Sequence, residues 1–371
     1  MEKLNAGKFI QALGAKKKMN PLSGQLELTY RCQLRCAHCY CVGLGNAARE
    51  LSTSEWKRII DDIRSAGCLF ITFSGGDPFI RHDFLELYRY AKTQGFLVSI
   101  FSNAIALTPR IIKFLEKSPP VSMEISLNGL SKETYEAVSG IPGSFAIAIR
   151  TIRALAKTNL RVILKVMCLQ QNKHEVVKIK HWVGAKFGTA AQKRYRFKCA
   201  SLVFPRLDRD QFPLRSRLST DELEKVFCQD PELSKEHQEM LAADFPDLSR
   251  KPSFMYHCTS WRENFFVDPY GRLKFCGLSS RYTVDLRTAS FAHGFYHVFP
   301  RIAQQRFKTD SKCRACKLRP VCFYCPARAY LETGNDEGPV PYYCELAQNM
   351  AARMAKTPPK RVGVEHSVRE S

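Results

Sequence analysis

Between residues 24 and 228 the chain alternates six short apolar runs with stretches that have the periodicity of amphipathic helices. Each apolar run has six to ten residues and is rich in β-branched and aromatic side chains, which is typical of a strand buried on both faces. Strands that alternate regularly with helices predict a parallel sheet wound in one direction. The predicted strands are residues 24–30, 68–73, 96–102, 121–127, 161–169 and 195–204.

Capping sequences mark where the intervening helices begin. Ser52 and Ser219 are each followed three residues later by a glutamate, which is the pattern of a capping box. Thr108 precedes Pro109, a residue favoured at the first helical position. Six strand–helix units are too few for the closed eight-fold barrel, so we expect an α/β fold with an open, partial (β/α)6 barrel. The loops after the strands are then the candidate sites, because chemistry in such sheets gathers at the carboxyl ends of the strands.

The chain has 371 residues, which exceeds the length of one ordinary domain. The sequence pattern changes after Cys258. Seven cysteines lie within the 87 residues that begin there, among short strands and turns. We expect a second, smaller domain in this region. The predicted division is a basic N-terminal segment 1–23, a core 24–228, a helical linker 229–257, a cysteine-rich domain 258–348 and a basic tail 349–371.

The sequence contains no run of 18 apolar residues, and residues 1–20 lack the apolar centre of a secretory signal. We therefore expect a cytoplasmic protein without a membrane partner. The 15 cysteines should stay reduced there, and they are better interpreted as metal ligands and core residues than as disulfides.

The formal net charge is +22, and much of it falls in residues 150–217, which hold 17 Lys/Arg against Glu175, Asp208 and Asp210. A positive field attracts anionic partners such as an acidic peptide, a nucleic acid or a membrane surface. Solvated helix faces are the simpler interpretation of the same residues. Of the anionic partners we favour an acidic peptide or carrier protein, and we expect no nucleic-acid partner.

Three cysteines follow the first predicted strand with the spacing C-x3-C-x2-C, at Cys32, Cys36 and Cys39. A four-iron cluster is ordinarily held by four cysteines, so three on one loop would leave one iron open to a small molecule. Zinc is the alternative, with His38 or Cys41 as the fourth ligand. Structural zinc sites usually pair two C-x2-C units, which favours iron–sulfur here.

This cysteine spacing after the first strand of a six-unit barrel resembles the radical S-adenosylmethionine (SAM) enzymes. The resemblance implies that Cys32, Cys36 and Cys39 hold a [4Fe-4S] cluster whose fourth iron binds SAM. The segment after the second strand resembles that family's Gly-Gly-Glu-Pro element, which receives the cofactor's ammonium group; its glycines would let the backbone approach a ligand. The usual arginine near Ser139 is absent, which leaves Arg150 or Lys165 as the candidate cation for the cofactor's carboxylate. The cofactor-binding residues implied are Ser74, Gly75, Gly76, Asp77, Asn103 and Ser126.

The C-terminal cysteines resemble the SPASM extension of radical SAM enzymes that modify peptides and proteins. The resemblance implies up to two auxiliary [4Fe-4S] clusters. Cluster I would be held by Cys258, Cys276 and Cys325, with His257, Ser260 and Asp268 as the polar groups nearby. Cluster II would be held by Cys313, Cys316, Cys322 and Cys344. A zinc-binding appendage is the alternative, because C-x2-C pairs serve both metals.

The resemblance implies an enzyme that cleaves SAM reductively to a 5′-deoxyadenosyl radical, which takes a hydrogen atom from the substrate. We favour a maturase of a ribosomally made peptide, and no catalytic side chain is assigned. Twenty-three residues precede the first strand, too few for a peptide-recognition domain, so a separate small recognition or carrier protein is expected, with a flavodoxin or ferredoxin as electron donor. The alternatives are a sulfatase-maturing (formylglycine-generating) enzyme, an enzyme of haem or quinone cofactor synthesis, and a basic zinc protein that binds nucleic acid.

Overall fold

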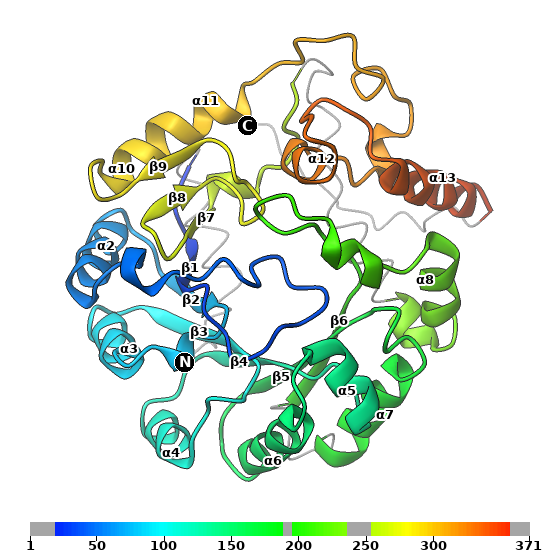
Figure 1. Cartoon of the computed structure of the whole chain (residues 1–371). Coiled ribbons are helices and arrows are strands. Elements are labelled where there is room, and N and C mark those ends of the chain that lie inside the picture. The colour runs from blue at the N-terminus through cyan, green and yellow to red at the C-terminus, as the bar shows by residue number, and fades with distance from the viewer. Residues whose placement is uncertain (1–18, 188–194, 236–253, 357–371) are drawn as a thin grey trace, which may run out of the picture.

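The computed structural model describes residues 19–187, 195–235 and 254–356 (Figure 1). Within them one nine-stranded sheet has the order β6-β5-β4-β3-β2-β1-β7-β8-β9. The first six strands in the chain are all parallel, and each pairs with the next one in sequence. These are β1 (Ser23–Thr29), β2 (Phe70–Gly75), β3 (Leu97–Ser102), β4 (Ser122–Ser126), β5 (Val162–Met167) and β6 (Tyr195–Ala200).

The six predicted strands are confirmed, and each begins within two residues of the predicted position. The sheet runs from β6 at one edge to β9 at the other and does not close on itself within the described residues. The fold is therefore an α/β fold with an open sheet, as predicted. The sheet is curved and the helices lie outside it (Figure 1), so its inner face, called the lumen face below, is the one that the helices do not cover.

The helices that cover the outer face begin where the capping sequences predict. Both capping boxes form, at Ser52 and Ser219, and the Thr108 hydroxyl accepts a hydrogen bond from the Ile111 amide. The helices are α2 (Thr53–Ser65), α3 (Phe84–Thr93), α4 (Pro109–Lys117), α5 (Lys132–Ser139), α6 (Ser144–Ala156), α7 (Val176–Phe187) and α8 (Thr220–Phe227). Short 3₁₀ helices span Ala47–Arg49, Pro78–Ile80, Phe212–Ser216, Ser260–Arg262 and Arg319–Val321.

Alternation along each strand separates the core from the lumen, because successive side chains point to opposite faces. On β5, Val162, Leu164 and Val166 are fully buried in the apolar core between sheet and helices, whereas Lys165 is half-buried on the other face. The lumen face therefore carries polar side chains that the helices do not cover.

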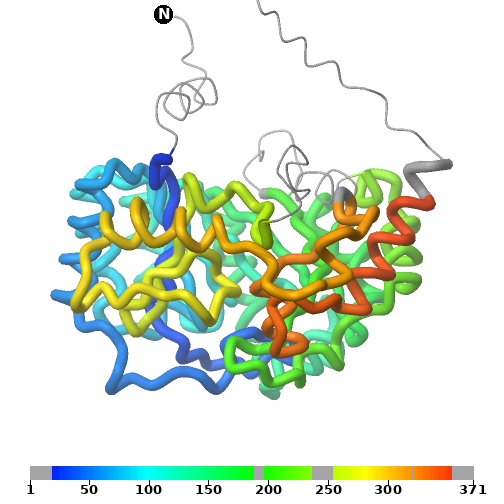
Figure 2. Tube along the Cα trace, turned by 90° about the horizontal axis from the view of Figure 1, so that it is seen from above, coloured from blue at the N-terminus to red at the C-terminus, as the bar shows by residue number. Residues whose placement is uncertain are grey.

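The sheet continues into the cysteine-rich region. Strand β7 (Asn264–Val267) pairs in parallel with β1, and β8 (Arg272–Lys274) and β9 (Thr283–Asp285) extend it as an antiparallel meander. Figure 2 shows this region lying directly beside the first strand. The division at residue 258 stays a prediction, and residues 236–253 of the predicted linker are outside the described part. The region's helices are α10 (Phe291–His293), a π-helical turn (Gly294–Val298), α11 (Phe299–Ala303), α12 (Pro326–Thr333) and α13 (Pro341–Lys356).

Among the described helices, none combines the length and the apolar character that a bilayer span requires.

Candidate functional site

The first cysteine loop follows β1 and is fixed to α5 by backbone hydrogen bonds. The amides of Arg35 and Ala37 donate to the carbonyls of Ser139 and Val138, each at 2.9 Å. Gly140 ends α5 with a φ of +69°, and a side chain there would press on the Arg35 carbonyl oxygen at 2.7 Å. The loop is thus held against a rigid helix end.

The three thiols of this loop are close enough to influence one another. Burial raises the pKa of Cys36 well above its usual value, and the thiols of Cys39 and Cys32 raise it further. Burial raises the pKa of Cys32 to about 12. Cys41 adds a fourth thiol, with its Sγ 3.7 Å from that of Cys39. Since metals bind thiolates, loading this loop with metal would release protons.

Gln33, which lies between the first two cysteines, connects the loop to the ends of β2 and β3. Its Nε2 donates to Asp77 Oδ2 at 2.9 Å and to Asn103 Oδ1 at 3.0 Å. Asn103 Nδ2 in turn donates to Cys32 Sγ at 3.2 Å. The structure therefore brings together Cys32, Asp77 and Asn103, three predicted site residues. Sequence reasoning missed Gln33, although its place between two cysteines was a signal.

Asp77 is completely buried. Burial raises the pKa of this carboxyl to about 6, although hydrogen bonds from the Phe79 amide and from Gln33 and Ser102 oppose the shift. A carboxyl that burial holds near neutrality gains most from a cation placed beside it. Asp77 is thus suited to receive an ammonium group.

Gly75 and Gly76 bring the end of β2 against the end of β1. A Cβ on Gly75 would lie 2.1 Å from the Thr29 carbonyl oxygen, and one on Gly76 would lie 2.1 Å from that of Arg31. The Gly76 amide also donates to the Thr29 carbonyl at 2.7 Å. The close approach that these glycines permit in this structure is to the neighbouring strand, which fixes where the cysteine loop leaves the sheet.

Buried polar atoms without a hydrogen-bond partner surround the loop in the described part of the chain. They are Arg31 Nε, Gln33 Oε1, His38 Nδ1 and Ser74 Oγ. Ser126, the remaining predicted contact, ends β4 and is half-buried. Unpaired buried polar groups are costly, so a polar ligand that bonds to them fits this place.

The two cations proposed for the cofactor's carboxylate lie in different places. Arg150 is exposed on α6, on the outer layer. Lys165 projects from β5 into the lumen, where its Nζ lies 2.8 Å from Glu124 Oε1. Lys198 of β6 contacts the other oxygen of Glu124 at 3.1 Å.

The second cysteine group lines a cavity of about 500 Å³. Cys258, Cys276 and Cys325 all face it, together with Cys322, His257 and aromatic side chains. Burial raises the pKa of Cys276 to about 11, with the thiols of Cys325 and Cys258 adding to the shift. The structure therefore brings the three residues predicted for cluster I together.

Asp268, named with this group in the sequence, lies elsewhere. It accepts hydrogen bonds from the amides of Tyr270 and Arg272 and pairs with the Arg272 side chain at 2.7 Å. These bonds build the turn between β7 and β8, so Asp268 serves that turn and lines a different cavity.

The third group is Cys313, Cys316, Cys322 and Cys344. Burial raises the pKa of Cys322 to about 11, and the thiols of Cys344, Cys313 and Cys316 raise it further. Burial of Cys313 raises the pKa of its own thiol, and the thiols of Cys344 and Cys316 raise it further. The structure brings these four thiols near one another, and the iron–sulfur cluster inferred for them stays a prediction.

None of the 15 cysteines, all of which lie in the described ranges, is joined in a disulfide. Within those ranges no three His, Cys, Asp or Glu side chains are arranged to hold a single metal ion. In a four-iron cluster each thiolate bonds a different iron, so its ligands stand farther apart than those of a zinc ion. The donor set of all three groups is thiol-rich, which suits iron–sulfur clusters.

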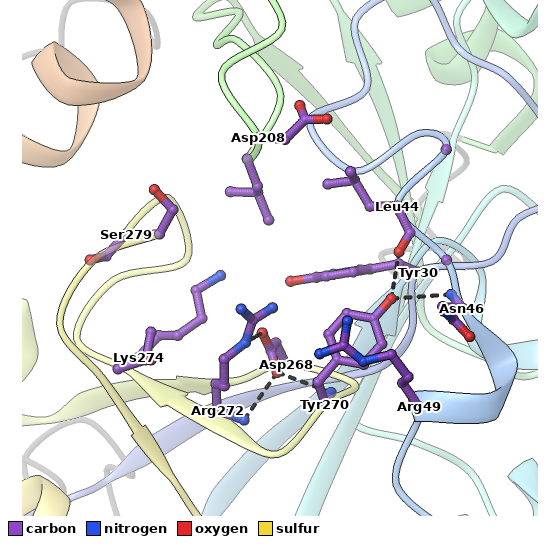
Figure 3. A pocket seen from close by; sticks show the side chains of 15 residues that line it. Tyr30, Leu44, Asn46, Arg49, Asp208, Asp268, Tyr270, Arg272, Lys274 and Ser279 are labelled. Carbon is purple, nitrogen blue, oxygen red and sulfur yellow. Dashed lines mark hydrogen bonds and ion pairs between the residues drawn. The ribbon is translucent and has the colours of Figure 1, made fainter. Parts of the chain in front are cut away.

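A cavity of about 480 Å³ lies between the first cysteine loop and the β7–β9 meander (Figure 3). At one side of it the Tyr270 hydroxyl donates to the Leu44 carbonyl and accepts from the Asn46 amide. Lys274 and Tyr30 also point into this cavity (Figure 3). The loop and the C-terminal strands are therefore packed together through polar contacts.

Comparisons with known proteins agree with this geometry. Residues 26–183 match the model of the radical SAM superfamily. The chain is 25% identical to the AdoMet-dependent heme synthase of Methanosarcina barkeri, in a match that covers 85% of this chain and 94% of that protein. It is 37% identical to the mycofactocin maturase MftC of Mycolicibacterium smegmatis, over 37% of this chain and only 34% of that protein.

Solved structures show the same fold. SuiB of Streptococcus suis, bound to S-adenosylmethionine, superposes with a TM-score of 0.67 at 15% identity, over 91% of this chain and 81% of that one. The same protein bound to its precursor peptide SuiA gives a TM-score of 0.64 at 16% identity, over 93% of this chain and 80% of that one.

Proposed function

Because residues 26–183 form a radical SAM domain, we propose that this enzyme takes a hydrogen atom from a peptide or protein substrate and so matures a ribosomally made peptide. Radical SAM enzymes use a [4Fe-4S] cluster and SAM, which together supply a 5′-deoxyadenosyl radical when bound. The protein's own part is to bind, to orient and to exclude water.

The single observation that carries the proposal is the junction of Cys32, Gln33, Asp77 and Asn103. It ties the cysteine loop to the ends of two neighbouring strands through hydrogen bonds of 2.9–3.2 Å. In the proposal the thiols of Cys32, Cys36 and Cys39 hold the cluster.

The same geometry supports the cofactor residues that we propose. Asp77 receives the cofactor's ammonium group, because its buried carboxyl gains from a cation. Ser74, with its unpartnered hydroxyl, and Asn103 and Ser126, at the ends of β3 and β4, take the other polar groups of the cofactor.

The C-terminal cysteines fit two auxiliary clusters, one in the cavity of Cys258, Cys276 and Cys325 and one at the third group. A peptide substrate is supported by the relatives named for peptide maturation and by the fold shared with SuiB. We further propose a flavodoxin-like or ferredoxin-like electron donor, a separate peptide carrier and a reducing, cytoplasmic location.

A carboxylated tetrapyrrole is the second candidate substrate. The chain spans about a third of the mycofactocin maturase but 94% of the heme synthase, and the latter match includes 85% of this chain. A match of that extent is the specific observation that favours haem chemistry.

An anaerobic turnover experiment tests both candidate substrate classes, the peptide and the carboxylated tetrapyrrole. The reconstituted protein is incubated with SAM and a strong reductant, and 5′-deoxyadenosine is measured alone, with peptides encoded beside the gene, and with Fe-coproporphyrin III. We expect cleavage of SAM in every case and a mass change in one substrate class. A protein with full iron content that forms no 5′-deoxyadenosine would contradict the proposed function.

A further inference from the structure

We propose that Lys165 and Lys198 form a carboxylate-binding site on the lumen wall of the barrel, which holds an acidic group of the substrate beside the proposed cofactor site. This inference rests on the proposed function, because it concerns the substrate of the same site.

Glu124 organises the two lysines. Its oxygens lie 2.8 Å from Lys165 Nζ and 3.1 Å from Lys198 Nζ, and the three residues come from the neighbouring strands β4, β5 and β6. The Glu124 side chain is 6% exposed, whereas those of Lys165 and Lys198 are 29% and 55% exposed. Each ammonium group has three donors, and Glu124 takes one from each, so each lysine keeps donors that Glu124 does not occupy.

The cluster carries a net positive charge. Two ammonium groups meet one carboxylate, and Lys165 followed by Lys198 lowers the pKa of Glu124 against the effect of its burial. Glu124 is therefore ionised, and the sum over the three groups is +1. A partly buried positive charge attracts an anion more strongly than one in bulk water, since the local dielectric constant is lower.

The position of the cluster links it to the proposed cofactor site. Lys165 stands in register with Ser126, at the end of β4. Ser126 is one of the residues proposed above to contact the cofactor. A carboxylate on the lysines would thus place the adjoining carbons of the substrate beside the proposed cofactor site.

Lys198 is the more accessible of the two lysines. It lies on β6, an edge strand of the sheet in the described residues, and its side chain is 55% exposed against 29% for Lys165. An anion that approaches from solvent therefore meets Lys198 more readily than Lys165. This difference in exposure suits an acidic group carried on a larger molecule.

An acidic side chain of a peptide and a carboxylate of a tetrapyrrole offer the same chemistry, and binding measurements separate them. The full-length reconstituted protein is titrated with a glutamate-rich decapeptide and its glutamine counterpart, and with Fe-coproporphyrin III and its tetramethyl ester. The variants are Lys165→Met and Lys198→Met, with Lys113→Met on the exposed face of α4 as the matched control. The dissociation constant of SAM is measured in parallel.

We expect one of the two acids to bind at least tenfold more tightly than its neutral counterpart, and this preference to disappear in both lumen variants but not in the control. The SAM dissociation constant of Lys198→Met should stay unchanged, with iron content and thermal unfolding confirming that both variants fold.

Three outcomes would overturn the inference: no charge-dependent binding of either acid to the parent protein, retained preference in both variants, or a loss of SAM affinity in Lys198→Met, which would assign that lysine to the cofactor's carboxylate. Failure of the proposed function is distinct, because it shows as a parent protein that does not cleave SAM.

Discussion

Lys274 and Glu27 form an ion pair with an Nζ–Oε2 distance of 3.8 Å, and their side chains are only 3% and 1% exposed. Glu27 lies on β1 and Lys274 on β8, so the pair joins the barrel to the C-terminal strands. The hydroxyls of Tyr30 and Tyr40 also donate to Glu27, at 2.8 and 2.5 Å. Tyr40 directly follows Cys39, and Lys274 lies two residues before Cys276. Because both side chains contact Glu27, this carboxylate connects two of the cysteine groups.

Removing the cation of this pair should destabilise the protein. We expect Lys274→Met to lower the free energy of unfolding by about 3–5 kcal/mol, because it leaves a buried carboxylate without its charge partner. Denaturant unfolding measures the change. The double variant Lys274→Met/Glu27→Gln should recover much of the loss, and a single variant as stable as the parent would contradict the role of the pair.

The first cysteine loop should be indispensable for SAM cleavage. Cys36→Ala should lose about four irons per chain and all 5′-deoxyadenosine formation, because the loop offers one thiol for each of three irons. Cys228→Ala, at the exposed end of α8, is the control and should keep both. Unchanged 5′-deoxyadenosine formation by Cys36→Ala would show that this loop does not hold the cluster.

The metal content should separate iron–sulfur from zinc. Three clusters require about 12 irons per chain, and replacing Cys258, Cys276 and Cys325 together with serine should lower this to about 8. Anaerobic iron, sulfide and zinc analyses give the numbers. About four irons in the parent protein, accompanied by zinc, would indicate a zinc-binding C-terminal region instead.

Acid should weaken the start of α8. The Lys173 ammonium, followed by the Ser219 amide, lowers the pKa of Glu222 to about 2. A depressed carboxyl pKa stabilises the folded state above the unfolded pKa of about 4.3, and that stability is lost as the pH falls toward 2. Because Glu222 is 28% exposed, we expect about 1 kcal/mol after solvent screening.

Unfolding measurements at pH 6 and pH 3 test this sign. The parent protein should lose more stability between the two values than Glu222→Gln does, by about 1 kcal/mol. If the parent and Glu222→Gln lost equal stability between the two pH values, Glu222 would not contribute to the destabilisation by acid.

A second buried pair ties α12 to the barrel. Arg217 contacts both oxygens of Glu332, at 2.7 and 3.0 Å, and also donates to the Val203 carbonyl. Both side chains are 8% exposed. Arg217→Lys should lower the midpoint of thermal unfolding although it keeps the charge, since lysine lacks the two-pronged geometry. A midpoint equal to that of the parent would mean that charge alone suffices.

The barrel could be predicted from sequence because its signals are local. Apolar runs of strand length, the capping boxes at Ser52 and Ser219 and the proline at 109 each depend on neighbours along the chain, and each forms as expected. The spacing of the cysteines is a local signal as well, and the iron–sulfur sites inferred from it stay predictions.

Contacts between distant residues carried no such signal. The meeting of Glu124, Lys165 and Lys198 depends on strand register, and a shift of one residue would send a side chain to the other face. The pairing of β7 with β1 joins segments some 240 residues apart, and no local pattern encodes it. The roles of Gly75 and Gly76 depend on the path of β1, which the glycines themselves do not reveal.

The pairing of β7 with β1 has a consequence for the integrity of the whole chain. β1 is hydrogen-bonded on both sides, by β2 and by β7. In a polypeptide that ended before residue 264, β1 would become an edge strand with unpaired amide and carbonyl groups. Exposed edges of this kind pair with strands of other molecules. The cysteine-rich region therefore also guards against aggregation, and its loss during synthesis or proteolysis would yield insoluble material instead of a smaller catalyst.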